Sequence, residues 1–505
     1  MVKTSFKLDI EQLKKSIYEK FYRSTDVTQE KVGLELELFP FVKQTRGRPI
    51  PAEILDADGN GTFDLILKNM QHSQAPFTTS WDENFLIFET VDGGNVSFEP
   101  GGQMEYSSSS QNNVSAAIRE VTANVNKTSD ILAEKGISLF HGAINPWYSI
   151  AETDLKMRKP RYRAMDQYMK SVGPYGQQMM RLTASLQVNL DFGDQKTARQ
   201  RWLAANLMAP VFTALFGNSP FAGRKVTGAH SYRSITWQKL DHSRTGFPHL
   251  HSVNEDTVMP EDQYLNFALQ AAVILLPDES GVTGFRTKGV NFQQWMESGF
   301  NGWYPDMDDW ETHLTTLFPE VRPKGFLECR FIDGLPKAWW AVPAILLPSI
   351  IYNASATQQV IDLMMPHYQE LHQMLQQASI SGVAAFPKLA RQIFEIGLNS
   401  SYYQSEPELL AYCERFYKNY TYLGKSPAED LLQLNQRSVF DFKQYENYEE
   451  RMLEVARPPE FAIFKTSQQK MASSPVVNMI KQHGMPIKPG PAKQVALCTP
   501  SNCCS

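Results

Sequence analysis

The chain has 505 residues, of which 42% are hydrophobic and 20% charged, and its 49 basic and 54 acidic residues give a formal net charge of −5. This apolar fraction excludes a generally disordered or fibrous protein, and the near balance of charge gives no electrostatic support for nucleic-acid binding. Only five cysteines are present, and the last eight residues hold three of them, Cys498, Cys503 and Cys504. A disulfide-rich secreted fold is therefore not expected.

Helical and alternating patterns of apolar residues follow one another along the chain. Residues 7–25 predict a helix, and residues 32–39 predict a strand, because apolar side chains alternate there with Glu35 and Glu37. The same criteria predict, in order, extended residues over 96–107, a helix over 111–135, a strand over 180–192, a helix over 198–216 that Pro210 kinks or breaks, a strand over 325–332, and mostly helix from 339 to about 460. This mixture favours the α+β class.

The N-terminus and the most apolar segment bear on location. Residues 1–15 lack the apolar core of a secretory signal. Residues 338–352 are the most apolar stretch, but they are fewer than the ~20 that span a membrane, and they include Pro343 and Pro348. They predict a buried core helix. We therefore expect a cytoplasmic protein without a membrane segment.

The character of the chain changes near its end. Residues 1–465 are expected to form one large domain. In residues 466–505, Ser, Pro, Gly and Lys dominate and no apolar period survives, which predicts a flexible linker and a Cys-rich tail.

Common motifs for metals and nucleotides are missing. Residues 56–61 begin like a calcium loop, but the twelfth position, where a bidentate Glu is required, is Leu67. The sequence has no G-x-x-x-x-G-K-[ST] loop, no G-x-G-x-x-G after a strand, no H-E-x-x-H and no C-x-x-C. A nucleotide, if it binds, is held without the common glycine loops.

Carboxylates gather on predicted strands. Glu35 and Glu37 share one face because strand side chains alternate. Glu99 and Glu105 flank the Pro100-Gly-Gly turn, where glycine lets the backbone approach a ligand closely. Such a set is stable beside a hard cation such as Mg²⁺. The alternative is that these carboxylates face water on one side of an amphipathic sheet.

Basic and aromatic residues supply a complement. Arg233, Trp237, Asp241 and Arg244 lie within residues 231–246. Arginine binds carboxylates and phosphates with two parallel hydrogen bonds. Each residue alone is typical of a surface ion pair, but together with the carboxylates they favour phosphoryl chemistry.

Several of these segments resemble the glutamate–cysteine ligase family of the plant and alphaproteobacterial type. The resemblance covers roughly residues 30–355, and its motifs stand in the same order as in the family. They are 98–105 (FEPGGQME), 179–192 (MMRLTASLQVNLDF), 214–221 (ALFGNSPF), 241–246 (DHSRTG), 309–322 (DWETHLTTLFPEVR) and 327–330 (LECR).

The resemblance implies a glutamine-synthetase-like fold, in which an antiparallel sheet forms a funnel surrounded by helices. It also implies an ATP- and Mg²⁺-dependent ligase that joins the γ-carboxylate of glutamate to the amine of cysteine through an acyl phosphate. Phosphorylation fits the chemistry, because a carboxylate is a poor electrophile until it carries a leaving group. Residues 1–465 are then the catalytic domain.

The resemblance further assigns roles to individual residues. The expected Mg²⁺ ligands or near-ligands are Glu35, Glu37, Glu99, Glu105 and Glu328. Gln187 and Asn189 are expected to point into the same space. Arg233 would anchor the substrate α-carboxylate and Arg330 would contact the phosphoryl group. Trp237, Arg244 and His313 are weaker candidates that would shape the substrate pocket.

Two departures from the family pattern stand out. Arg181 and Leu182 are in swapped order, and a one-residue shift on a strand would move the arginine to the opposite face. Phe331 is expected to add bulk beside Glu328 and Arg330 and so to alter substrate choice. The bacterial branch that makes γ-glutamylcysteine for ergothioneine is also similar, at residues 183–185, so both the glutathione and ergothioneine pathways stay open.

The C-terminal tail lies outside the resemblance and has three interpretations. It is a dispensable extension, an oxidisable thiol sensor or metal-binding tag, or a substrate. In the last case the ligase would use ATP to modify its own peptide, for example by closing a thiazoline at Cys498, Cys503 or Cys504, with the tether raising the effective concentration. A non-catalytic binding protein is a further alternative, against which the retained acidic set argues.

Overall fold

The computed structural model describes residues 8–22, 30–44, 47–70, 77–82, 85–251, 259–279, 283–285, 289–435 and 441–464. The expected tail, 466–505, with Cys498, Cys503 and Cys504, lies outside the described residues, so the domain boundary and the interpretations of the tail stay predictions.

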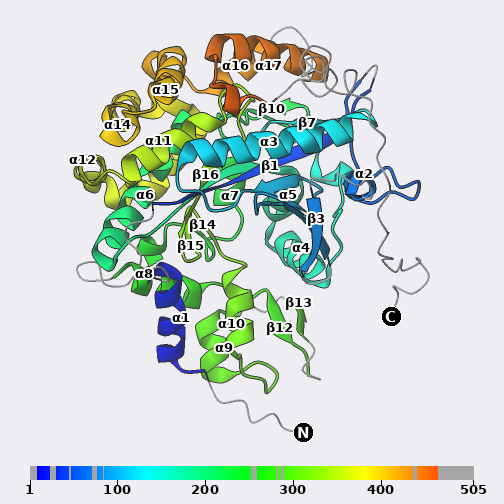
Figure 1. Ribbon diagram of the computed structural model, residues 1–505. Coiled ribbons are helices and arrows are strands. Elements are labelled where there is room, and N and C mark those ends of the chain that lie inside the picture. The colour runs from blue at the N-terminus through cyan, green and yellow to red at the C-terminus, as the bar shows by residue number, and fades with distance from the viewer. Residues whose placement is uncertain are drawn as a thin grey trace, which may run out of the picture. The chain divides into compact units, whose positions relative to one another are not determined.

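One large antiparallel sheet organises the described chain (Figure 1). Its path runs through β15 (Val321–Pro323), β16 (Leu327–Asp333), β8 (Ser185–Leu190), β1 (Val32–Val42), β6 (Met104–Ser107), β5 (Asn95–Phe98), β4 (Phe85–Thr90) and β3 (Phe77–Asp82), with β2 (Ile50–Pro51) and β7 (Ile137–Phe140) also paired to β1. Short pairs elsewhere are β9 (Phe221–Ala222) with β10 (Lys225–Val226), β11 (Thr245–Gly246) with β14 (Phe318–Pro319), and β12 (Leu275–Pro277) with β13 (Thr283–Phe285).

Helices surround this sheet. Those of the first half are α1 (Ile10–Tyr22), α2 (Thr62–Met70), α3 (Val114–Ala133), α4 (Pro160–Val172), α5 (Pro174–Leu182), α6 (Gln195–Leu215) and α7 (Tyr232–Gln238). Those of the second half are α8 (Pro260–Gln270), α9 (Phe292–Ser298), α10 (Met307–Leu314), α11 (Ala341–Ile351), α12 (Ala354–Met364), α13 (Leu371–Ser381), α14 (Pro387–Asn399), α15 (Pro407–Asn419), α16 (Pro427–Asn435) and α17 (Phe442–Ala456). The predicted α+β class, with a large antiparallel sheet and surrounding helices, is confirmed.

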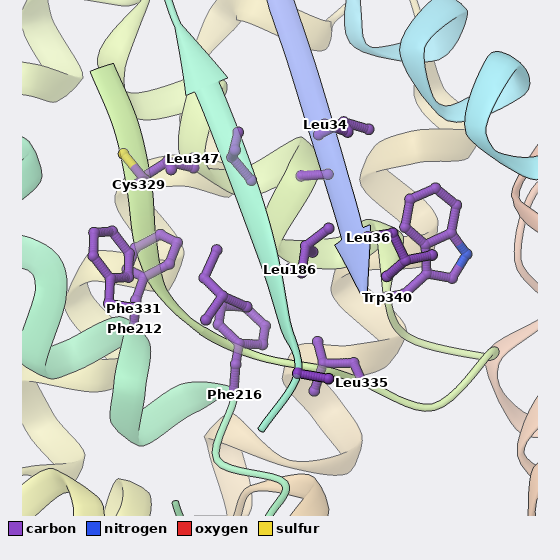
Figure 2. Packing of buried hydrophobic residues seen from close by; sticks show 14 of the residues in the cluster. Leu34, Leu36, Leu186, Phe212, Phe216, Cys329, Phe331, Leu335, Trp340 and Leu347 are labelled. Carbon is purple, nitrogen blue, oxygen red and sulfur yellow. The ribbon is translucent and has the colours of Figure 1, made fainter. Parts of the chain in front are cut away.

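One face of the sheet is apolar and packs against helices. Strand alternation puts leucines of β1 and β8 on this face, and Cys329 and Phe331 of β16 join them (Figure 2). Helices α3, α6 and α11 contact these strands, and Phe331 packs edge-on against Phe212 of α6, with ring centroids 5.7 Å apart. The prediction that Phe331 adds bulk beside Glu328 and Arg330 is therefore wrong, because its side chain lies on the opposite face.

The helices explain two further differences from expectation. Residues 180–182 end α5 and do not begin the central strand, which starts at Ser185. Pro210 lies inside α6 and does not end it. A proline removes one helical hydrogen bond, but its neighbours Met208, Val211 and Phe212 are fully buried, and this packing holds the helix together across the proline.

The most apolar segment forms the core helix that the sequence predicts. Every residue of α11 is buried, and Pro348 lies inside the helix. Within the described segments, none of the helices combines the length and apolar character that crossing a bilayer requires.

Candidate active site

The second face of the central strands is polar. Because β8, β1 and β6 are neighbours, their side chains form rows across the sheet: Glu35 lies opposite Gln187, and Glu37 lies opposite Glu105. On the other side of β8, Glu328 of β16 lies opposite Asn189. The sheet thus brings together on one face carboxylates and amides that are up to about 300 residues apart in the sequence.

Hydrogen bonds orient the two carboxylates of β1. Glu37 accepts from the Ser185 amide at 2.9 Å, from the Ser185 hydroxyl at 2.9 Å and from Gln187 Nε2 at 3.1 Å. Glu35 accepts from Asn189 Nδ2 at 2.8 Å. Gln187 and Asn189 therefore do point toward the glutamates. Ser185 was missed by the sequence analysis, although its spacing of two from Gln187 places it on the same face.

A glycine turn holds the second pair of carboxylates. The amide of Glu99 donates to the Gln103 carbonyl at 2.8 Å, and the amide of Gly102 donates to the Glu99 carbonyl at 2.8 Å. A Cβ at Gly101 would lie 2.4 Å from the Arg181 carbonyl oxygen, so this position requires glycine to let the turn pack on the end of α5. The Arg181 side chain itself is paired with Asp166, at 2.7 Å.

The carboxylates raise one another's proton affinity. Burial, with the charges of Glu328 and Glu105, raises the pKa of Glu35 to about 7. Burial is also the largest cause that raises the pKa values of Glu37, Glu99 and Glu105. Crowded, partly desolvated carboxylates of this kind favour a bound cation.

The donor set matches the chemistry of Mg²⁺ only in part. No three His, Cys, Asp or Glu side chains in the described ranges are placed so that they could hold one metal ion together. Mg²⁺, however, usually takes one or two carboxylates and completes its coordination with water and substrate phosphates. One or two of the carboxylates of Glu35, Glu37, Glu99 and Glu105 would be enough for that coordination.

Glu328 differs from the other four glutamates. It is fully buried, and it accepts hydrogen bonds from Arg322 at 2.6 Å, Lys324 at 2.9 Å and Arg330 at 3.0 Å. Despite burial, these cations hold its pKa well below the usual range. In this arrangement Glu328 is the counter-ion of a basic cluster. Arg322 and Lys324 were missed by the sequence analysis, although Arg322 lies between Val321 and Pro323 on β15 and Lys324 directly follows that strand.

Two arginines flank the indole ring of Trp237. The guanidinium carbons of Arg233 and Arg330 lie 5.5 Å and 5.4 Å from the ring centroid. Arg330 Nη1 donates to Gln187 Oε1 at 2.9 Å, and Arg233 Nη2 donates to the Arg330 carbonyl at 2.8 Å. Arg233, Trp237 and Arg330 therefore lie together beside the polar face.

Asp333, at the end of β16, holds Arg233 and the start of α7 in place. It accepts from the Ser219 and Ser231 hydroxyls at 2.7 Å and 2.8 Å and lies 3.8 Å from Arg233 Nη1. Ser231 is also the N-cap of α7, the helix that carries Arg233 and Trp237. The position of α7 is thus tied to the sheet through one buried carboxylate.

Arg244 and His313 occupy a different environment. Arg244 is fully buried and donates to Asp241 at 2.8 Å and to the Thr316 carbonyl at 3.0 Å. His313 Nε2 lies 2.9 Å from the Ala268 carbonyl, and burial lowers the pKa of this histidine to about 3. None of these partners belongs to the polar face of the sheet. The hydrogen bonds of Arg244 and His313 instead hold together the segments around the sheet.

Replacing Arg244 by alanine is therefore expected to lower the free energy of unfolding by about 3–5 kcal/mol, because Asp241, whose side chain is 13% exposed, would lose its positively charged partner. Chemical denaturation measures this loss. The matched control is Arg224→Ala, whose side chain is 52% exposed and whose loss should stay within about 0.5 kcal/mol. If Arg244→Ala were as stable as the wild type but had a raised KM, Arg244 would be a residue of the substrate pocket and not a structural one.

A cavity of ≈ 1030 Å³ adjoins the basic cluster. Arg322 and Lys324, which bind Glu328, also line this cavity, and Lys15 and Lys20 of α1 line it as well. Arg322 and Lys324 thus lie between this cavity and Glu328 on the sheet.

Comparisons with known proteins address the identity of the chain. Relatives named glutamate–cysteine ligase, chloroplastic, occur in Nicotiana tabacum, at 34% identity over 55% of this chain and 53% of the relative, and in Medicago truncatula, at 32% identity over 67% of each. The chain spans about half the length of the first of these relatives. A solved glutamate–cysteine ligase from Francisella tularensis in complex with AMP is similar at 12% identity and a TM-score of 0.47, covering 90% of this chain and 91% of that one.

The family itself follows from the longest match. The model of glutamate–cysteine ligase family 2 matches residues 31–450. That range includes all the strands of the polar face, the glycine turn and helix α7. The resemblance stated from the sequence motifs is confirmed, and the chain belongs to glutamate–cysteine ligase family 2.

Proposed function

We propose that the protein is an ATP- and Mg²⁺-dependent ligase that forms γ-glutamylcysteine from glutamate and cysteine. The observation that carries the proposal is the polar face of the sheet, where Glu35, Glu37, Glu99 and Glu105 lie beside Arg233 and Arg330. Membership of the family and the names of the plant relatives support the reaction.

The reaction has two group transfers. An oxygen of the glutamate γ-carboxylate attacks the terminal phosphorus of ATP, and ADP leaves. The free amine of cysteine then attacks the acyl carbon, phosphate leaves, and the nitrogen loses a proton as the amide forms. Both steps concentrate negative charge on phosphoryl oxygens, which preorganised cations stabilise.

We assign the carboxylates of Glu35, Glu37, Glu99 and Glu105 to Mg²⁺, which when bound would neutralise phosphate charge. Glu328 already binds three cations, so its proposed role is to orient Arg330 and Lys324. ATP would enter through the cavity lined by Arg322 and Lys324.

Arg330 is proposed to contact the transferred phosphoryl group, since its guanidinium is fixed by Gln187 and Glu328 on the polar face. Arg233 is proposed to bind the α-carboxylate of glutamate, with Trp237 packed against both guanidiniums. A buried, preorganised arginine binds a carboxylate with little loss of side-chain entropy.

The test is product formation by the full-length protein. ADP release is expected only when glutamate, cysteine, ATP and Mg²⁺ are all present, with γ-glutamylcysteine detected by mass spectrometry and with loss of turnover in EDTA. The mass of the protein itself should stay unchanged. A mass increase or loss confined to residues 494–505 would favour modification of the tail instead, and no turnover with any combination would contradict the proposal. A cytoplasmic location is part of the proposal.

A further inference from the structure

Glu320 lies on the polar face of the sheet but was not among the expected site residues. It stands between β14 and β15; its amide donates to the Gly246 carbonyl, and its carbonyl accepts from the Arg330 amide, both at 3.0 Å. Arg322 is two residues further on and contacts Glu328. In the pairing of β15 with β16, Arg322 lies opposite Glu328, and the hydrogen bond from the Arg330 amide continues this register and sets Glu320 opposite Arg330. Residues that lie opposite each other in an antiparallel pair have their side chains on the same face.

The two arginines that Glu320 faces already have acidic partners. The charges of both Arg233 and Arg330 act on Glu320. Arg330 is paired with Glu328 at 3.0 Å, and Arg233 lies 3.8 Å from Asp333. In the part of the chain that the structure describes, the Glu320 carboxylate has no ion pair within 4.0 Å and no hydrogen bond of its own.

An unpaired, half-buried carboxylate beside an arginine matches one class of ligand. An α-amino acid carries a carboxylate and an ammonium group on the same carbon, so the protein that binds it needs a cation and an anion side by side. Trp237 forms an apolar wall against both guanidiniums and against Phe318, the residue that begins β14. The contact between Trp237 and Phe318 places α7 beside β14 (Figure 1).

We propose that Glu320 binds the α-ammonium group of the amino acid whose α-carboxylate binds Arg233. The inference rests on the proposed function, in which that amino acid is glutamate. The cysteine amine is excluded as the partner, because it must lose its proton to attack the acyl group. Glu320 is then a specificity-determining residue that separates α-amino dicarboxylates from dicarboxylates without the amine.

The experiment compares glutamate with glutarate, which has the same two carboxylates and no amine. Full-length wild type and Glu320→Gln are titrated with each compound by calorimetry, and KM and kcat are measured with each. The variant is expected to bind glutamate ~10- to 100-fold more weakly, which corresponds to the loss of one charge-assisted hydrogen bond. Its affinity for glutarate should not fall. The ratio of the affinities for glutamate and glutarate should therefore be much smaller in the variant than in the wild type.

The matched control is Glu414→Gln, a glutamate on α15 that is 52% exposed and paired only with Lys418 among the described residues; both affinities should stay at wild-type values. If Glu320→Gln does not fold, Glu320→Asp replaces it, with the same selective loss for glutamate expected. Equal weakening for glutamate and glutarate, or an unchanged preference, would overturn the assignment of Glu320. If the wild type binds glutamate but releases no ADP, the proposed function is contradicted. The binding comparison between glutamate and glutarate then still tests whether Glu320 binds the ammonium group.

Discussion

Replacing Glu37 by alanine is expected to lower kcat by roughly 10²–10³-fold and to move the Mg²⁺ dependence of turnover to higher concentration. The reason is the central place of this side chain. It lies on β1, directly opposite Glu105, and three hydrogen bonds from Ser185 and Gln187 aim its oxygens across the polar face.

Stability separates this role from a structural one. Burial raises the pKa of Glu37, which means that the folded chain holds its negative charge at a cost near neutral pH. A carboxylate that served only the fold would lower stability when removed. Glu37→Ala is instead expected to unfold at the same or a higher denaturant concentration than the wild type, while turnover is lost.

The matched control for this substitution is Glu89→Ala. Glu89 is exposed on β4 of the same sheet, so kcat and the Mg²⁺ titration should both be unchanged. If Glu37→Ala instead leaves the Mg²⁺ titration unchanged and raises only the KM of glutamate, Glu37 contacts the amino acid and not the metal.

Strand alternation made much of the site predictable from the sequence. Glu35 and Glu37 share a face with period two, and so do Gln187 and Asn189, whichever strands lie beside them. The sequence pattern alone could not show that β8 and β6 both flank β1, because the order of strands in a sheet depends on packing between distant segments. The family motifs supplied the missing grouping of these strands.

The same alternation explains why the expectation for Phe331 was wrong. Phe331 follows Arg330 directly, so on a strand it must face the opposite way, toward Phe212. Arg244 and His313 lie inside well-matched motifs. A motif does not show whether a side chain already uses its hydrogen bonds within the protein, as Arg244 does with Asp241 and Thr316. Glu320 was missed because a single carboxylate near two prolines carries no local pattern.

The second large effect is expected at Arg330. Replacing it by lysine should lower kcat about 10²-fold with little change in the KM of glutamate. Arg330 Nη1 already donates to Gln187 and Glu328, so the planar fork can hold those groups and still present further donors to a phosphoryl oxygen. Lysine keeps the positive charge, but its single ammonium cannot serve all three acceptors in that geometry.

Comparison with two other arginines tests this assignment. Arg391→Lys changes a surface arginine that donates to the Tyr422 carbonyl, and kcat and KM should both stay at the wild-type values. Arg233→Lys should raise the KM of glutamate more than it lowers kcat, since that guanidinium is proposed to bind substrate. An Arg330→Lys enzyme with a raised KM and a normal kcat would exchange the two roles, because a group that acts on the transition state must affect kcat when substrate saturates the enzyme.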